Sequence, residues 1–197
     1  MQVLKFGGTS VANAQNMSQV IDIVTQAVDR DRTILVASAI SGCTDTLIKI
    51  GTLASQRDES YKELIDELQD KHHVIIRDFL PLEKQAESQE VCDSLFDSLR
   101  SIAQGVFLLG ELSPASLDAI QGFGELWSTK ILATKLASIG IATKWIDSRN
   151  IIRTVAKGDK NIVDVQKTYS RVNEMVDSNP ITQLFVLPGF IASDKQG

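Results

Sequence analysis

The sequence begins with an apolar run, a glycine-rich segment, a helical stretch and a second apolar run, and this order limits the folds open to the chain. The two short β-type runs, residues 3–6 and 34–37, are each followed by small residues. Between them Asn13 can cap a helix, whose apolar residues recur at three- and four-residue steps: Met17, Val20, Ile21, Val24, Ala27 and Val28. The pattern predicts a βαβ unit with parallel strands, and such sheets bind ligands at the carboxyl ends of their strands.

The middle of the sequence is different in kind. Residues from about 44 to 110 are charged, lack β-type runs and carry helical apolar stripes, which predicts an insertion of packed helices. Ser113 and Pro114 are suited to begin another helix, which we expect Gly122 and Gly124 to interrupt. The remaining expected elements are a helix at 125–138, strands at 143–146 and 184–187, and a helix at about 165–177. We therefore expect an α/β fold of three αβα layers, with a mostly parallel central sheet and a helical insertion.

The loop after the first strand is the strongest candidate for a phosphate site. It brings together a cation at Lys5, two glycines at Gly7 and Gly8, and hydroxyls at Thr9 and Ser10. Glycines let a backbone approach an anion closely, and a lysine can balance charge on transferring phosphate oxygens. The lysine precedes the glycines, so the order is not that of a P-loop. The alternative is an ordinary strand-to-helix turn with a surface lysine.

Two further segments could bind a small amino acid. The loop after the second strand carries hydroxyls at Ser38, Ser41 and Thr44, which could donate to a carboxylate. Its alternative role is helix capping by Thr44 or Ser41. Glu125 follows glycines within an apolar helical region, where a buried carboxylate would need a partner such as a substrate ammonium. A solvent-facing glutamate is the alternative there.

Composition excludes several classes of protein. The net charge is −5, and no basic stripe interleaved with aromatic residues is present, so we expect no nucleic-acid partner. The apolar runs are too short to cross a membrane, and residues 1–30 lack the pattern of a secretory signal, which predicts a cytoplasmic protein. Cys43 and Cys92 predict reduced, semi-buried thiols, with no disulfide framework or zinc site. The adjacent His72 and His73 would point about 100° apart on a helix, so we expect a solvated or partly packed pair.

Five segments, taken in order, closely resemble the aspartokinases of the amino-acid kinase family. They are Lys-Phe-Gly-Gly-Thr-Ser-Val at 5–11, Ser-Ala-Ile-Ser-Gly-Cys-Thr-Asp at 38–45, Gly-Glu-Leu at 124–126, Trp-Ile-Asp-Ser-Arg at 145–149 and Gly-Phe-Ile-Ala at 189–192. The opening residues 3–14 look most like the kinase end of bifunctional aspartokinase/homoserine dehydrogenases. The resemblance covers the whole chain.

The resemblance implies ATP-dependent phosphorylation of the β-carboxylate of L-aspartate with Mg²⁺, the first step of lysine, threonine and methionine synthesis. By motif, Lys5 would contact the transferring phosphate, with Gly7 and Gly8 lining its cradle and the Thr9 and Ser10 hydroxyls beside them. Likewise, the segments that hold L-aspartate in the family correspond here to Thr44 and Glu125, with Ser38 next to them. The resemblance assigns no metal ligand to any residue of this chain.

Aspartokinases continue beyond the point that corresponds to Gly197 into the nucleotide-binding half and regulatory domains. Residues 1–197 are therefore expected to be the N-terminal portion of a kinase domain, inactive by itself and homo-oligomeric in the full-length parent. Two alternatives stay open. One is a catalytically silent binding or assembly piece that uses the helical insertion as an oligomer surface, and the other is an amino-acid kinase with a different substrate.

Overall fold

The structure, a computed structural model, describes residues 1–158 and 160–194. In chain order its elements are β1 (Gln2–Phe6), the 3₁₀ turn η1 (Gly8–Val11), α1 (Ala14–Val28), β2 (Thr33–Ala37), α2 (Cys43–Ser55), α3 (Tyr61–Phe79), α4 (Leu82–Leu109), α5 (Pro114–Ser138), β3 (Thr143–Trp145), α6 (Ser148–Ile151), β4 (Thr154–Lys157), β5 (Lys160–Val163), α7 (Val165–Asp177) and β6 (Leu184–Pro188). The four strands expected from the sequence are β1, β2, β3 and β6.

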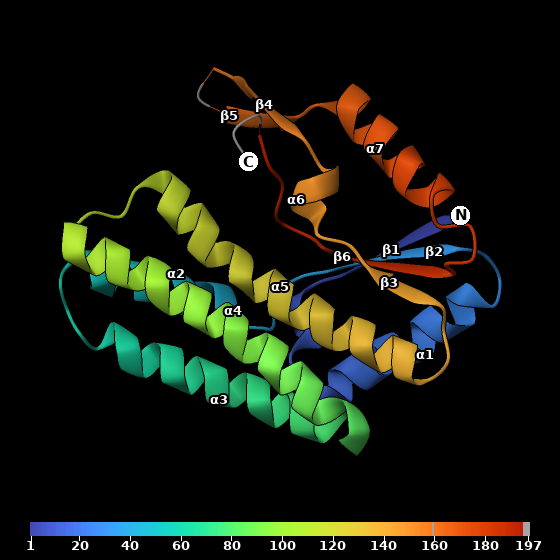
Figure 1. The fold of residues 1–197 in the computed structure, drawn as a ribbon, viewed down its shortest axis with the longest axis horizontal. Helices are drawn as coiled ribbons and strands as arrows, with labels where there is room; N and C mark the ends of the chain where they lie inside the picture. Colours follow the sequence, from blue (N-terminus) through green and yellow to red (C-terminus); the bar gives the residue numbers. More distant parts are fainter. Residues whose placement is uncertain (159, 195–197) are drawn as a thin grey trace.

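These four strands form a parallel sheet in the spatial order β1-β2-β6-β3. The central strands β2 and β6 are mostly buried on both faces, so their sequences are almost continuously apolar, whereas the edge strand β1 alternates between half-buried and exposed residues. Helices α1 to α5 lie on one face of the sheet and α7 covers the other (Figure 1). The expected α/β class with a parallel sheet is confirmed.

Side chains cap two helices as their sequences predict. The side chain of Asn13 accepts a hydrogen bond from the backbone N–H of Asn16 at 2.9 Å, which begins α1. The hydroxyl of Ser113 accepts from the N–H of Ser116 at 3.1 Å, with Pro114 as the first residue of α5. Each cap satisfies a backbone donor that the first helical turn leaves unpaired.

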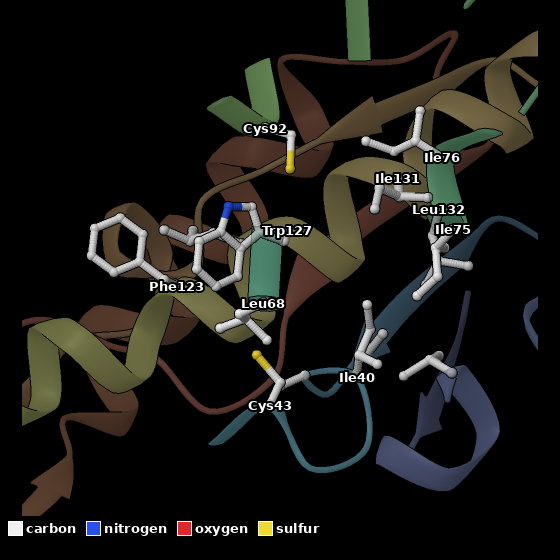
Figure 2. Packing of buried hydrophobic residues seen from close by; sticks show 14 of the residues in the cluster. Ile40, Cys43, Leu68, Ile75, Ile76, Cys92, Phe123, Trp127, Ile131 and Leu132 are labelled. Atoms are coloured by element: carbon white, nitrogen blue, oxygen red, sulfur yellow. The ribbon is translucent and has the colours of Figure 1, made fainter. Parts of the chain in front are cut away.

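Trp127 of α5 is the centre of the packing between α3, α4 and α5. Its ring stacks on Phe96 of α4 with centroids 4.0 Å apart and planes 15° apart, and it contacts Phe123 and the His72 ring of α3. Figure 2 shows Trp127 between the side chains of Phe123, Cys92 and Leu68. Large aromatic surfaces removed from water in this way dominate the stability of a core. None of the helices in the described residues is both long and apolar enough to span a membrane.

His72 corrects the expectation of a solvated or partly packed histidine pair. Its side chain is fully buried, and its Nδ1 atom is 2.7 Å from the carbonyl oxygen of Leu68. Burial lowers the pKa of His72 to about 4, so the ring is neutral at physiological pH. His73 points elsewhere and pairs with Asp93. The helical spacing separated the two rings correctly, but it did not show which of them faced the core.

The predicted interruption of α5 at Gly122 and Gly124 is wrong, because the helix runs unbroken from Pro114 to Ser138. Both glycines serve close packing. A Cβ atom at Gly122 would lie 3.1 Å from Cγ2 of Ile191, and one at Gly124 only 2.7 Å from Cβ of Ala39. The antiparallel pair β4–β5 was not predicted either, because it consists of two short strands joined through Gly158, which has a positive φ of 61°.

The stack on Trp127 predicts which α4 substitution destabilises the fold. Phe96→Ala is expected to lower the free energy of unfolding by about 3–5 kcal/mol, because Phe96 is fully buried and the neighbouring rings cannot fill the cavity. The matched control, Leu82→Ala at an 82 % exposed position of the same helix, is expected to change it by less than about 0.5 kcal/mol. Urea unfolding followed by circular dichroism measures both, and equal losses would contradict the assignment.

Candidate active site at the carboxyl edge of the sheet

The loops that follow β1 and β2 lie against each other at the carboxyl edge of the sheet. The N–H of Ser38 donates to the carbonyl of Phe6 at 3.1 Å, which carries the strand pairing into the second loop. A Cβ atom at Gly8 would lie 3.1 Å from the carbonyl oxygen of Ala39 and 3.7 Å from the Cα of Ser41. Glycine at this position therefore lets the two loops pack closely.

Lys5 lies near the end of β1 and is exposed. Leu4 and Phe6 pack on the main core, so the alternation of the strand directs Lys5 to the opposite face, where its register partner Val36 packs on the α7 side. Within the described residues its ammonium has no hydrogen bond or ion pair.

Glu125 is a buried carboxylate that reaches the same edge from α5. Its residue is 4 % exposed, and Oε1 accepts a hydrogen bond from the backbone N–H of Ala39 at 3.3 Å. Burial raises the pKa of Glu125, and the hydrogen bond from Ala39 opposes part of that rise. No cation pairs with this carboxylate in the described part of the chain. The solvent-facing alternative for Glu125 is therefore wrong.

Helix α5 fixes the loop after β2 at a second point as well. The hydroxyl of Ser128 donates to the carbonyl of Ser38 at 2.7 Å, one turn along the helix from Glu125. The carbonyl and the N–H of two adjacent residues, Ser38 and Ala39, are thus both bound by α5. This close approach is possible because Gly124 has no side chain to collide with Ala39.

The hydroxyl groups predicted for the site lie around this loop. Ser38 and Thr44 are half-buried, and neither side chain makes a hydrogen bond with another described residue. The predicted alternative of helix capping by Ser41 or Thr44 is wrong, since the N-cap of α2 is Gly42, with a φ of 77° and no side-chain capping bond. The hydroxyls of Ser38 and Thr44 therefore remain available to a ligand.

The remaining predicted residues follow β1. Gly7 and Thr9 are exposed, whereas Gly8 and Ser10 are half-buried. The N–H of Ser10 donates to the carbonyl of Gly7 at 3.0 Å, which closes the 3₁₀ turn. The structure therefore brings the glycine segment, the loop after β2 and Glu125 to one edge.

The structure adds two elements to the edge that the predicted site residues did not include. The ammonium of Lys71 on α3 donates a hydrogen bond to the carbonyl of Ser41 at 3.0 Å. The helical insertion therefore also contacts this loop. The end of β6 arrives beside β2, where the N–H of Gly189 donates to the carbonyl of Ala37 at 2.9 Å. The Gly-Phe-Ile-Ala segment at 189–192 signalled the second element, but no local pattern signalled Lys71.

The contact at Gly124 makes a prediction about glycine replacement. Gly124→Ala is expected to lower the free energy of unfolding by about 1–3 kcal/mol, because the new methyl group collides with Ala39. Gly105→Ala is the control near the C-terminal end of α4, where an added Cβ atom would meet nothing within 4 Å outside the helix's own backbone. There alanine should stabilise by about 0.5–1 kcal/mol through helix propensity. Urea titration gives both values, and a stabilised Gly124→Ala protein would show that the close approach is not required.

Comparison with known proteins supports one family throughout. The chain is 29% identical over 196 residues to bifunctional aspartokinase/homoserine dehydrogenase 2 of Arabidopsis thaliana, a chloroplastic protein, covering 98% of this chain and 21% of that protein. Aspartokinase 3 of the same organism, also chloroplastic, is 29% identical over 191 residues, which is 96% of this chain and 34% of the relative. The chain thus spans about a fifth of the bifunctional relative's length.

Solved structures agree. Aspartokinase III of E. coli, in complex with lysine and aspartate, superposes with a TM-score of 0.86 at 25% identity, over 100% of this chain and 42% of that one. The same enzyme in complex with aspartate and ADP gives the same values. The predicted resemblance to aspartokinases and their bifunctional forms is therefore confirmed. Since the model of the amino acid kinase family matches residues 1–197, the chain belongs to that family.

Proposed function

We propose that this chain supplies the aspartate-binding side of a kinase that transfers phosphate from ATP to the β-carboxylate of L-aspartate, giving 4-phospho-L-aspartate. The observation that carries the proposal is the buried carboxylate of Glu125, held against the loop after β2 with one hydrogen bond from another residue and no cation partner in the described residues. Residues 1–197 would form the N-terminal portion of the kinase domain, and the segment at about 44–110 its helical insertion.

The substrate ammonium would be the missing partner of Glu125. An ionised carboxylate removed from water is unfavourable unless a charge or several donors compensate it. The α-ammonium of L-aspartate supplies that charge and additional N–H donors. The free hydroxyls of Ser38 and Thr44 could then donate to a substrate carboxylate beside it.

The lack of a structural need for glycine at position 7 supports a phosphate site on the other side of the edge. Its φ of −81° is open to any residue, and a Cβ atom there would meet nothing within 4 Å. Neither backbone conformation nor internal packing therefore requires glycine, in contrast to Gly8. Close approach of a phosphate to the backbone would explain the missing side chain.

Lys5 would stabilise the charge that develops during transfer. An oxygen of the β-carboxylate attacks the γ-phosphorus of ATP, the bond to the bridging oxygen breaks, and ADP leaves with that oxygen. The enzyme needs no nucleophile, because positioning and electrostatic stabilisation supply the catalysis. Lys5 and Glu125 approach the edge from different faces of the sheet, so aspartate would lie across it, with its ammonium toward Glu125 and its β-carboxylate toward Lys5.

Magnesium would require little from this part of the chain. Within residues 1–158 and 160–194 no three acidic, histidine or cysteine side chains are arranged to hold a metal ion. Mg²⁺ commonly binds nucleotide phosphates through few protein ligands, and there it neutralises the phosphate charge. Since the chain spans only part of its relatives, we propose that by itself it binds L-aspartate weakly and ATP hardly at all.

Glu125→Gln tests the ammonium site and has opposite effects on stability and binding. Glutamine can still accept from Ala39 but carries no charge, so L-aspartate affinity should fall at least about tenfold in a calorimetric titration. Because the pKa of Glu125 is raised in the folded state, its ionisation costs no stability at low pH and lowers stability as pH rises from the unfolded-state pKa through the folded-state pKa. The variant should therefore be more stable than wild type at pH 8, and the difference should shrink toward pH 4.

Aspartate binding should show the reverse trend with pH in the wild type. Affinity is expected to increase as pH rises through the pKa of Glu125, because the ionised form attracts the ammonium. Glu90→Gln, at an exposed position of α4 beyond its first turn and with no ion pair in the described residues, is the matched control and should change neither quantity. Unchanged aspartate affinity in Glu125→Gln would refute the ammonium site.

Lys5→Met tests the phosphate side in the complete gene product. Turnover, followed by trapping aspartyl phosphate as the hydroxamate, should fall at least about a hundredfold, because the charge facing the transferred phosphoryl group is lost. Gly7→Ala should also reduce turnover while leaving the melting temperature unchanged, since its new methyl group meets only open space. Lys49→Met, at an exposed position on α2, is the control. Normal turnover with methionine at position 5 would disprove the role given to Lys5.

A further inference from the structure

A pocket of about 290 Å³ lies between α4, α5 and the end of β3, apart from the residues of the proposed active site. Its walls are largely apolar, with contributions from Val91, Leu95, Trp127, Ile131, Ala137 and Trp145. We call it the α4–α5 pocket. Glu125 and Trp127 are two positions apart on α5 and so lie on opposite sides of the helix. Its volume suits a molecule with one ring, because drug-sized ligands generally occupy 300 Å³ or more.

Lys130 places an unpaired charge in the wall of this pocket. Its ammonium lies 3.7 Å from the centroid of the Trp145 ring and makes no hydrogen bond or ion pair with any described residue. Burial lowers the pKa of Lys130, although the nearby carboxylate of Asp147 favours the charged form. That carboxylate is already held by Arg149, at 2.6 Å. The three N–H donors of this ammonium thus have no acceptor among the described side chains and backbone groups.

Other charges at the pocket are already paired. Lys84, at the start of α4, lies 3.6 Å from Glu87 one turn away, and both line the same pocket. Lys130 therefore supplies the cation that a bound anion could use. The indole N–H of Trp127 is also without an acceptor in the described residues, and its nitrogen lies on the side facing Cys92, another residue of the pocket (Figure 2).

We propose that the α4–α5 pocket binds a small monocarboxylic acid with an aromatic or branched apolar body. The carboxylate pairs with the ammonium of Lys130, and the body lies against Trp127 and Ile131. L-Aspartate does not suit these walls, because its second carboxylate and its ammonium would be buried against apolar side chains. The proposal is independent of the kinase activity, since it uses none of the residues assigned to that reaction.

The protein carries its own reporter for this site. Its two tryptophans, Trp127 and Trp145, both line the pocket, so a ligand there changes the environment of both fluorophores. Phenylacetate is the probe, and phenylacetamide, with the same ring and no charge, is its neutral counterpart. Phenylacetate should give a saturable change in tryptophan emission and the same dissociation constant by calorimetry.

Substitutions at Lys130 decide whether the charge recognises the ligand. Lys130→Met should weaken phenylacetate at least about tenfold and change phenylacetamide by less than about twofold, because only the first loses an ion pair. Lys130→Arg keeps the charge and should stay within about threefold of wild type. Lys135→Met is the matched control on the same helix, since its ammonium lies over Phe79, 5.4 Å from the ring centroid, and does not line the pocket.

Dissociation constants are compared rather than emission amplitudes, because Lys130 itself contacts Trp145. Circular dichroism verifies that each variant is folded, and the comparison of phenylacetate with phenylacetamide on the wild-type protein carries the test if Lys130→Met does not fold. The proposal is overturned if phenylacetate produces no saturable change up to about 10 mM, if both lysine-to-methionine variants bind alike, or if phenylacetamide binds as tightly as phenylacetate.

Discussion

The contact between Gly124 of α5 and Ala39 in the loop after β2 is the constraint on which the proposed active site depends. Without a side chain at Gly124, the helix approaches closely enough for Glu125 to accept the N–H of Ala39 and for Ser128 to donate to the carbonyl of Ser38. These bonds bring a carboxylate under the edge of a parallel sheet, where it is mostly hidden from water. The raised pKa of Glu125 is the electrostatic consequence.

The helical layer determines where α5 can lie. Trp127, two residues after Glu125, is stacked on Phe96 of α4 and contacts His72 of α3, so the position of the carboxylate is fixed by packing far from the sheet. Lys71, the neighbour of His72, reaches the carbonyl of Ser41 from the same helix. The helical insertion thus helps to support the loop after β2. Sites held by rigid, packed elements keep their geometry more precisely than sites on free loops.

Local patterns in the sequence predicted much of this arrangement. The strand runs, the Asn13 and Ser113 caps, the parallel sheet and the closeness of the loops after β1 and β2 follow from periodicity, capping chemistry and the rule for parallel sheets. The same reasoning was wrong at Gly122 and Gly124, where glycine was interpreted as a helix breaker. Glycine there allows close packing of α5 on its neighbours. Tertiary packing stabilises the helix, and the loss of helix propensity at two positions is small compared with the packing gained.

By itself the sequence determined the class of the fold, the family and the chemical groups available at the edge of the sheet, because these depend on residue types and their spacing. Only the tertiary structure decided that Glu125 is buried, that His72 is neutral in the core and that Lys130 lines a pocket with no ion pair among the described residues. Burial and ion pairing depend on which residues from distant segments surround a group. That information is absent from any local stretch of sequence.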